Sequence, residues 1–229
     1  MPIDIETPAF VVDGDAIFAR ALALSSSGDR CRFAYSVKTL PVPEAVVLAR
    51  EAGWLVEVVS SDEYAFVCRL GISPEEIVLN GPSKDDNLLH AAFSGGAIVH
   101  VDSEEELRRA VKIRSAVGNG RLGVRLGLGV ADPRWARFGI DVSDTDASIR
   151  LLAEACSGQS LNGFHVHSGA NRASVQEFIA VSGKAIDFAR AYSLYVNTRL
   201  DWIDLGGGFG DSVVAPQGAV NWNPPEVED

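Results

Sequence analysis

Residues 33–39 read Phe33-Ala34-Tyr35-Ser36-Val37-Lys38-Thr39, a short strand-like run that ends on a single amine. Successive side chains of a strand face opposite sides, so Ala34, Ser36 and Lys38 share a small, polar face opposite a bulky apolar one. A lysine on such a face enters a pocket, where its amine can form a Schiff base with a carbonyl group. Taken alone, the segment favours the plainer alternative, a surface lysine that closes a strand.

Short apolar runs of this kind recur along the chain and alternate with amphipathic stretches. We predict seven strands, at residues 33–38, 54–59, 77–81, 97–102, 121–128, 161–167 and 200–205. Two of the intervening stretches open with the Ser-x-x-Glu pattern of a helix start, at residues 60–63 and 103–106. The alternation predicts a parallel sheet with helices, either a closed barrel or a doubly wound sheet.

The polar residues occupy alternate positions of the predicted strands and so share one face, which favours the barrel. One face of the predicted strands carries polar side chains, namely Glu57, Asn80, Arg125, His165 and His167. The other face carries apolar side chains, namely Val56, Val58, Val124, Leu126, Phe164 and Val166. A doubly wound sheet would bury the polar set under apolar helices, whereas a barrel gathers it at the carboxyl ends of its strands. We therefore expect an α/β fold of the (β/α)8 TIM-barrel type.

The composition fits one such domain and narrows the classes of partner. The chain has 229 residues, 47% of them hydrophobic, which is enough for one large core. A formal net charge of −11 argues against a nucleic acid or an anionic membrane as partner. Three widely spaced cysteines make no disulfide framework, and the N-terminus has no signal sequence. We expect a cytoplasmic protein.

Three consecutive glycines, Gly206 to Gly208, follow the seventh predicted strand. Glycines leave backbone N–H groups accessible and allow close approach, which suits a phosphate group. Barrels often bind phosphate in the loops after strands seven and eight, so position and composition agree. A flexible turn is the alternative. The spacing does not match the dinucleotide-binding fingerprint.

His165 and His167 lie two residues apart on the sixth predicted strand. They could bind zinc, but they supply only two ligands, and no third histidine or cysteine has a matching position. A histidine with satisfied hydrogen bonds in the core is one alternative, and a ring that lies flat against a planar ligand is another. Glu57 and Arg125 could form a mutual ion pair in the interior instead of taking part in chemistry.

Five segments together resemble one family. They are Tyr35-Ser36-Val37-Lys38-Thr39, Val56-Glu57-Val58-Val59-Ser60 with Glu63, Arg137-Phe138-Gly139-Ile140, Phe164-His165-Val166 with Ser168-Gly169, and Asp204-Leu205-Gly206-Gly207-Gly208-Phe209. In this order they resemble the motifs of the fold-type III pyridoxal-phosphate decarboxylases, the diaminopimelate and ornithine decarboxylase group. The likeness runs from about Thr7 to about Asp211.

The resemblance implies pyridoxal 5'-phosphate as the cofactor and assigns residues to its ring. Lys38 would form the internal aldimine with the cofactor and His165 would stack on the pyridine ring, and these two are the expected catalytic residues. Glu57 and Arg125 would line the surroundings of the ring.

The resemblance also assigns the cofactor phosphate to Ser168 and to Gly206, Gly207 and Gly208. It divides the chain into two parts. Residues 1–14 would be the N-terminal strand that pairs with a carboxyl-terminal β-domain, and residues 15–229 would be the cofactor-binding barrel, incomplete before its eighth strand.

The sequence departs from the family pattern at two positions and lacks one region. Leu40 stands where many members have Asn, and His167 stands where Gly is common, so the pocket wall and the substrate are expected to differ. The acidic-Pro-Gly-Arg segment of the eighth strand and the β-domain that follows it in the family are not in the sequence. The chain is then an excised piece, the product of a split gene or a degenerate paralogue.

The activity implied by the resemblance is decarboxylation of an amino acid, with diaminopimelate, ornithine or lysine as the family's substrates. A homodimer, or a partner chain that supplies the missing region, would complete the site. The alternative from another class is a catalytically inactive relative that binds the cofactor or regulates a full-length decarboxylase. A racemase on the same type of barrel ranks last.

Overall fold

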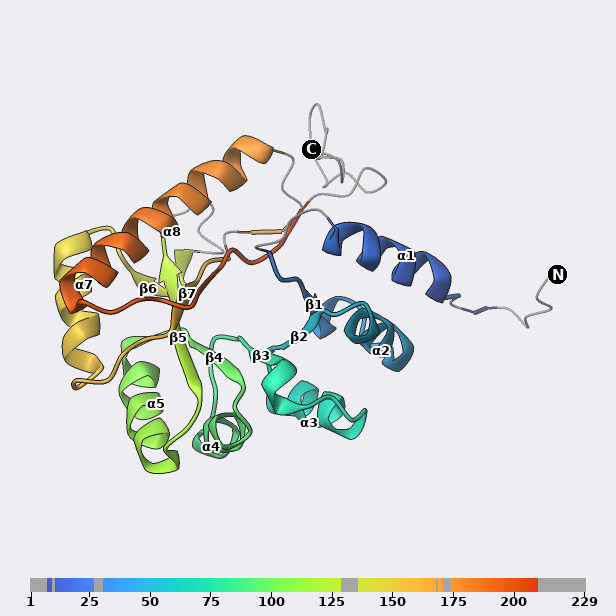
Figure 1. Cartoon of the computed structure of the whole chain (residues 1–229), viewed down its shortest axis with the longest axis horizontal. Helices are drawn as coiled ribbons and strands as arrows, with labels where there is room; N and C mark the ends of the chain where they lie inside the picture. Colours follow the sequence, from blue (N-terminus) through green and yellow to red (C-terminus); the bar gives the residue numbers. More distant parts are fainter. Residues whose placement is uncertain are drawn as a thin grey trace.

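A curved parallel sheet surrounded by helices forms this protein, as seen in a computed structural model (Figure 1). The structure describes residues 8–9, 11–26, 31–128, 136–167, 169–170 and 174–209. The strands are β1 (Ala34–Ser36), β2 (Leu55–Val58), β3 (Ile77–Leu79), β4 (Ile98–Val101), β5 (Arg121–Gly127), β6 (Ile140–Asp141), β7 (Gly163–His165) and β8 (Trp202–Asp204). The α-helices are α1 (Gly14–Ser25), α2 (Pro43–Glu51), α3 (Ser61–Arg69), α4 (Asp86–Ser94), α5 (Glu104–Val117), α7 (Thr145–Ala155) and α8 (Val175–Val196).

The sheet has the topology of a (β/α) barrel. Its strands pair in parallel in the order β1-β2-β3-β4-β5-β7-β8, and β6 pairs with the end of β5. β1 and β8 are the two ends of this path, and no strand of the described residues joins them. The seven predicted strands each contain one observed strand, so the predicted barrel fold is confirmed. Among the described residues, no strand follows β8, which corresponds to the seventh predicted strand. The two-residue strand β6 was not predicted, because it is too short to show a period.

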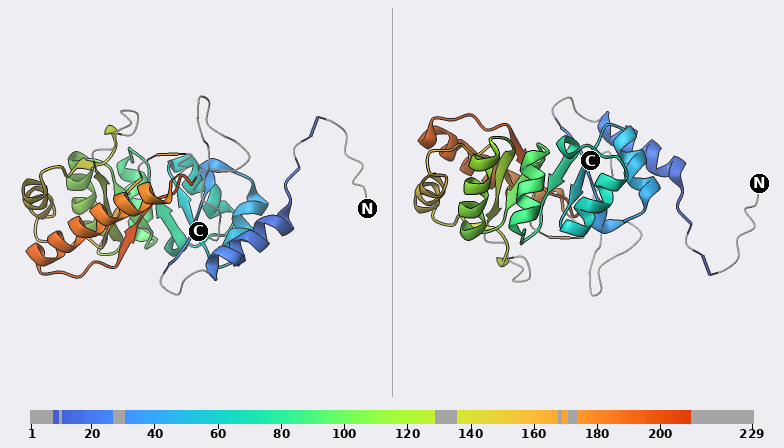
Figure 2. Two further views of the ribbon diagram at one scale, coloured as in Figure 1. Left: turned by 90° about the horizontal axis from the view of Figure 1, so that it is seen from above. Right: turned by 90° about the horizontal axis from the view of Figure 1, so that it is seen from below.

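The helices lie outside the curved sheet and follow it in sequence order from α2 to α8 (Figure 1). In the views from above and below, α1 and α7 lie at opposite ends of the molecule (Figure 2). No helix in the described ranges combines the length and the apolar character that crossing a membrane requires.

Two predicted helix starts are confirmed, with one difference in their hydrogen bonds. Ser60 and Ser103 cap α3 and α5, and each hydroxyl oxygen accepts the N–H three residues on, at 3.2 Å. In a capping box the glutamate would accept the N–H of the cap residue itself. Instead, the carboxylates of Glu63 and Glu106 accept the N–H groups of Val59 and Asp102, the residues just before the caps, at 2.8 Å.

The apolar face of the strands packs against the helices, as the alternation predicted. Val56, Val58, Val124 and Phe164 have no exposed surface. The Phe164 ring meets two aromatic rings of α8 edge to face, those of Phe188 at 5.4 Å and Tyr192 at 5.2 Å between centroids. The polar side chains therefore lie on the opposite, inner face of the sheet.

A second, smaller apolar cluster lies on the inner face. Leu55, Val78 and Ile98 form it, and the Trp202 indole packs against it. These residues precede the polar ones on their strands, so the inner face is apolar at the amino ends of the strands and polar at the carboxyl ends.

Candidate functional site

The predicted polar face is confirmed as one contiguous set of side chains. Glu57, Asn80, Arg125 and His165 are buried, and His167 is partly exposed. Asn80 donates from Nδ2 to Glu57 Oε1 at 3.2 Å, and Arg125 donates to the carbonyl oxygen of His167 at 3.1 Å. The strand register places Arg125 opposite His165. These contacts gather the set at the carboxyl ends of β2, β3, β5 and β7.

The sequence predicted that Lys38 ends the first strand, but in the structure Lys38 lies beyond the end of β1. The strand stops at Ser36, and Lys38 lies in the 3-10 helix η1 (Val37–Thr39), in which the Thr39 hydroxyl donates to the Ser36 carbonyl oxygen at 2.7 Å. The lysine side chain is 45% exposed, and its Nζ lies 3.5 Å from Glu57 Oε1. The site thus offers an accessible amine beside a carboxylate that borders the interior.

Arg125 pairs with Asp102 and not with Glu57, so of the two alternatives considered for Glu57 and Arg125 the structure does not contain the mutual ion pair. The guanidinium donates to Asp102 Oδ1 at 3.0 Å and lies over the Phe138 ring, 4.7 Å from its centroid. Burial lowers the pKa of Arg125, and the Asp102 carboxylate opposes that shift. Asp102 follows β4, the strand next to β5, whereas Glu57 lies on β2, three strands from Arg125.

His165 sits between another imidazole and a carboxylate. Its ring stacks on that of His100, with centroids 5.1 Å apart, and its Nδ1 lies 3.1 Å from Asp204 Oδ2 without the alignment of a hydrogen bond. Burial alone would raise the pKa of Asp204, but His165 and His100 hold it well below its usual range. The Asp204 carboxylate therefore stays ionised beside the two rings.

His167 follows β7 and makes a hydrogen bond to the glycine run after β8. Burial, together with the charges of Lys38, His165 and Arg125, lowers the pKa of His167 to about 4. The ring is therefore neutral near pH 7. Its Nδ1 accepts the backbone N–H of Gly207 at 3.5 Å.

The three glycines after β8 differ in what surrounds them. A Cβ on Gly206 would overlap the carbonyl oxygen of Val166, and a Cβ on Gly208 would overlap that of Gly169. Both also have positive φ, 68° and 93°. A Cβ on Gly207 has no heavy atom of the described structure within 4 Å. Gly206 and Gly208 are thus required by the fold, whereas Gly207 borders open space.

Among the described residues, three buried side-chain atoms have no hydrogen-bond partner: Ser36 Oγ, Arg125 Nε and His165 Nδ1. Each such group costs about 1–3 kcal/mol when it is left without a partner. All three belong to strands or strand ends that border the polar face. A bound polar molecule in this space would offer them partners.

His100, His165 and Asp204 bring potential metal-ligand atoms within 4.8 Å of one another. The zinc site considered from the sequence, His165 with His167, is not the cluster that the structure contains. Both nitrogens of His100 are already engaged, Nε2 by the Trp202 indole N–H at 2.8 Å and Nδ1 by Asn80 Oδ1 at 2.7 Å. The cluster is therefore explained by hydrogen bonding within the protein.

Four residues of this site were not predicted from the sequence, namely His100, Asp102, Trp202 and Asp204. Each lies in a strand that was predicted, at 97–102 or 200–205, and has the parity of the inner face. The same alternation that selected Arg125 would have selected them.

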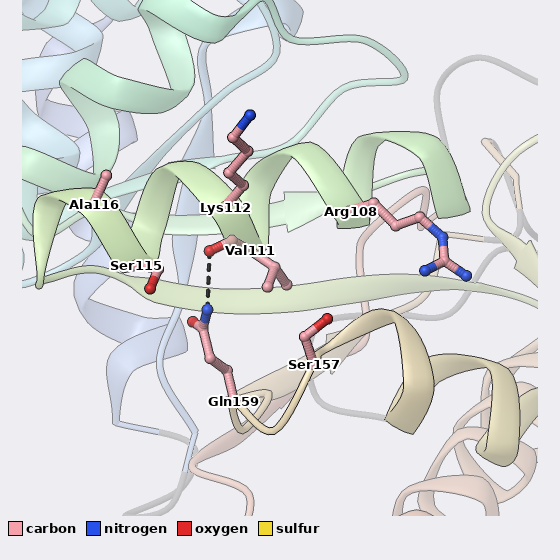
Figure 3. Close-up of a pocket in the computed structure, with 7 residues that line it drawn as sticks. All are labelled: Arg108, Val111, Lys112, Ser115, Ala116, Ser157 and Gln159. Carbon is pink, nitrogen blue, oxygen red and sulfur yellow. Dashed lines mark hydrogen bonds between the residues drawn. The ribbon is translucent and has the colours of Figure 1, made fainter.

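An open depression of about 510 Å³ lies elsewhere, on the outer helical layer (Figure 3). It is formed by α5 and the turn after α7, where Gln159 Nε2 donates to the Val111 carbonyl oxygen at 3.0 Å. Arg108, which also lines it, forms an ion pair with Glu104, with 2.8 Å between Nη2 and Oε1. None of the polar inner-face residues lines it.

An amine, a glycine-rich loop and buried polar groups lie at the carboxyl ends of the strands of a parallel barrel, which is where barrel enzymes have their active sites. Comparison with known proteins narrows this class. Residues 15–224 match the family described as "Pyridoxal-dependent decarboxylase, pyridoxal binding domain", and the chain belongs to that family. The resemblance seen in the sequence is thereby confirmed.

The relatives are decarboxylases about twice as long. L-glutamyl-[BtrI acyl-carrier protein] decarboxylase of Niallia circulans is 29% identical in an alignment of 221 positions that covers 90% of this chain and 50% of that protein. Diaminopimelate decarboxylase of Actinosynnema pretiosum is 27% identical, over 89% of this chain and 48% of that protein. The chain spans about half the length of the curated relatives that it matches.

A solved structure supports the fold. The crystal structure of diaminopimelate decarboxylase from Helicobacter pylori, complexed with L-lysine, superposes with a TM-score of 0.82 at 20% identity. The match covers 98% of this chain and 58% of that one.

Pyridoxal phosphate, the cofactor of the family, fits the residues present here. Lys38 supplies an exposed amine, a Cβ on Gly207 would meet no described atom within 4 Å, and Arg125 Nε is buried without a hydrogen-bond partner among the described residues. His165 Nδ1 is also buried without a hydrogen bond, although Asp204 Oδ2 lies 3.1 Å from it. Ser168, the other residue expected at the phosphate, lies outside the described residues.

Proposed function

We propose that this chain is the cofactor-binding part of an amino-acid decarboxylase, with Lys38 as the residue that binds pyridoxal phosphate covalently. The observation that carries the proposal is that an amine and a glycine run lie at the same edge of the parallel sheet, the edge formed by the carboxyl ends of its strands. Lys38 follows β1 and lies 3.5 Å from Glu57 Oε1, and Gly207 follows β8 and donates to His167 Nδ1. The amine is a partner for an aldehyde, and the glycine run is a partner for a phosphate.

In this proposal the protein positions the lysine and holds its proton. Glu57 Oε1, 3.5 Å from Nζ, is the acceptor placed to bind the ammonium group and to take a proton from it. His165 offers a flat ring parallel to that of His100. The cofactor, when bound, supplies the electron-withdrawing ring on which decarboxylation depends.

The phosphate is proposed to bind to the N–H groups of Gly206 to Gly208 and to Ser168. It would replace two acceptors in the loop, Asp204 Oδ1, which accepts the Gly206 N–H at 2.8 Å, and His167 Nδ1, which accepts the Gly207 N–H at 3.5 Å. Glycine backbones in such loops form concave arrays of donors that suit anions. Residues 1–14 are proposed to be a strand of a separate β-domain, and residues 15–229 to be the barrel. Of the first part, residues 1–7 and 10 lie outside the described residues.

The proposed substrate class is an amino acid with a free α-amino group. Relatives named for diaminopimelate and ornithine support this class. Leu40, which is 37% exposed, and His167 border the site and are the proposed points where its wall differs from the family. A second subunit, either another copy or a partner chain, is proposed to complete the substrate side.

The test is covalent labelling. The purified chain is mixed with pyridoxal phosphate and reduced with borohydride, and the labelled peptide is identified by mass spectrometry. We expect one label per chain, on Lys38, and its loss in Lys38→Ala. Lys184→Ala, which removes an exposed lysine of α8, is the matched control and should label normally.

Release of carbon dioxide from candidate amino acids is measured on the same preparations. Lys38-dependent release would support the decarboxylase. Specific labelling without any release would favour the alternative, a relative that binds the cofactor without turnover. Labels scattered over surface lysines in the unmodified chain would refute the assignment of Lys38.

A further inference from the structure

A buried chain of hydrogen bonds runs from strand β8 to Lys38. Trp202 donates from Nε1 to His100 Nε2 at 2.8 Å, and His100 Nδ1 contacts Asn80 Oδ1 at 2.7 Å. Asn80 donates from Nδ2 to Glu57 Oε1 at 3.2 Å. The same carboxylate oxygen accepts from Lys38 Nζ at 3.5 Å. The chain crosses β8, β4, β3 and β2 and reaches η1.

The direction of every bond in this chain follows from its first member. An indole N–H can only donate, so Nε2 of His100 must be its unprotonated nitrogen. Nδ1 then carries the proton and donates to the carbonyl oxygen of Asn80. The amide NH2 of Asn80 must therefore face Glu57. Burial, which lowers the pKa of His100 to about 3, keeps the ring neutral and this pattern intact near pH 7.

The surroundings hold the two rings in place. His100 is 2% exposed, and the missing side chain of Gly123 leaves the room that its ring occupies. Gly163 does the same for the Trp202 indole. Asp204 is the competing acceptor for the proton on Nδ1, but its Oδ2 is 3.7 Å away, against 2.7 Å for Asn80.

We propose that His100 is a positioning residue, which acts through Asn80 to fix the Glu57 carboxylate against Lys38. Lys38 is otherwise free to move, since nearly half of its side chain is exposed. The inference that the contact between Glu57 and Lys38 serves cofactor binding rests on the proposed role of Lys38. The relay itself is a property of the cofactor-free protein and is tested there.

The first measurement is the tautomer of His100, from nitrogen NMR of the labelled chain. We expect Nδ1 protonated and Nε2 unprotonated from about pH 5 to pH 8, a range in which an ordinary histidine titrates. Trp202→Phe removes the donor and should release this preference. Trp54→Phe is the matched control, because its indole also donates a hydrogen bond, to Ser25 Oγ at 2.9 Å, but outside the relay.

The second measurement is the reactivity of the Lys38 amine toward acetic anhydride, with the exposed Lys184 of the same chain as internal reference. Glu57→Gln removes the carboxylate and sets the upper limit of the increase. Loss of one neutral hydrogen bond corresponds to about a two- to ten-fold change, so Trp202→Phe and His100→Leu should raise the rate by that factor. His100→Gln, whose amide can accept from Trp202 and donate to Asn80, should restore the original rate.

These outcomes separate the relay from the proposed function. Protonation of His100 on Nε2 would overturn the relay. So would an unchanged Lys38 rate in both Trp202→Phe and His100→Leu when Glu57→Gln raises it. Failure of pyridoxal phosphate to label Lys38 would refute the proposed function and leave both of these measurements valid.

Discussion

Replacing Gly207 by valine separates binding of the cofactor phosphate from binding of its ring. The new side chain meets no described atom within 4 Å of its Cβ, so the fold should tolerate it, whereas Gly206 and Gly208 face carbonyl oxygens. The valine would fill the space beside the glycine N–H groups. A hydrogen bond to a charged group is worth about 1.5–3 kcal/mol, so losing one should weaken pyridoxal phosphate about 10- to 150-fold. Pyridoxal, which has no phosphate, should lose little affinity.

Both ligands are titrated against the original chain, Gly207→Val and Gly183→Val, by fluorescence or calorimetry. Gly183 lies in α8, and a Cβ there also meets no described atom within 4 Å, so this variant controls for the substitution itself. Equal losses for the two ligands, with folding unchanged, would show that the phosphate is bound elsewhere.

Two further predictions concern stability. Burial lowers the pKa of His100 to about 3 and of His167 to about 4, so between about pH 6.5 and pH 4 the unfolded chain binds more protons than the folded one, and stability falls on acidification. In this range each histidine adds about 1.4 kcal/mol per pH unit to the slope of the unfolding free energy against pH. Urea unfolding of His100→Gln at several pH values should show the slope reduced by that amount. An unchanged slope would contradict a neutral, buried His100. Lys84 is 1% exposed and pairs with Glu106 at 3.1 Å. Lys84→Met should therefore lower the free energy of unfolding by about 3–5 kcal/mol, whereas Lys184→Met on the surface of α8 should lower it by about 0.5 kcal/mol or less. Similar losses in the two variants would rule out a structural role for the pair.

The fold was predictable because its signals are local. Strand alternation with period two located all seven main strands, and the Ser-x-x-Glu patterns located the starts of α3 and α5. Parity alone also assigned the polar residues to the inner face. These features depend on neighbours within about four residues along the chain, which a single sequence contains.

The pairing within the site was not predictable in the same way. Arg125 could have met Glu57 or Asp102, since all three share a face, and only the strand order makes Asp102 the partner. The 3-10 turn that moves Lys38 out of the strand covers only three residues, Val37 to Thr39, which is too short to show a period in the sequence. Such choices depend on three-dimensional distances, not on periodicity.

The glutamates that begin α3 and α5 also bear on the order of assembly. Each joins its carboxylate to the N–H of a residue only four positions earlier, Val59 for Glu63 and Asp102 for Glu106. Closing so short a loop costs little chain entropy, and it requires no other part of the sheet. The contact between Trp202 and His100, by contrast, spans 102 positions and exists only when β8 has joined the sheet. The carboxyl ends of β2 and β4 are thus shaped locally, while the interior between them is completed by the most distant part of the described chain.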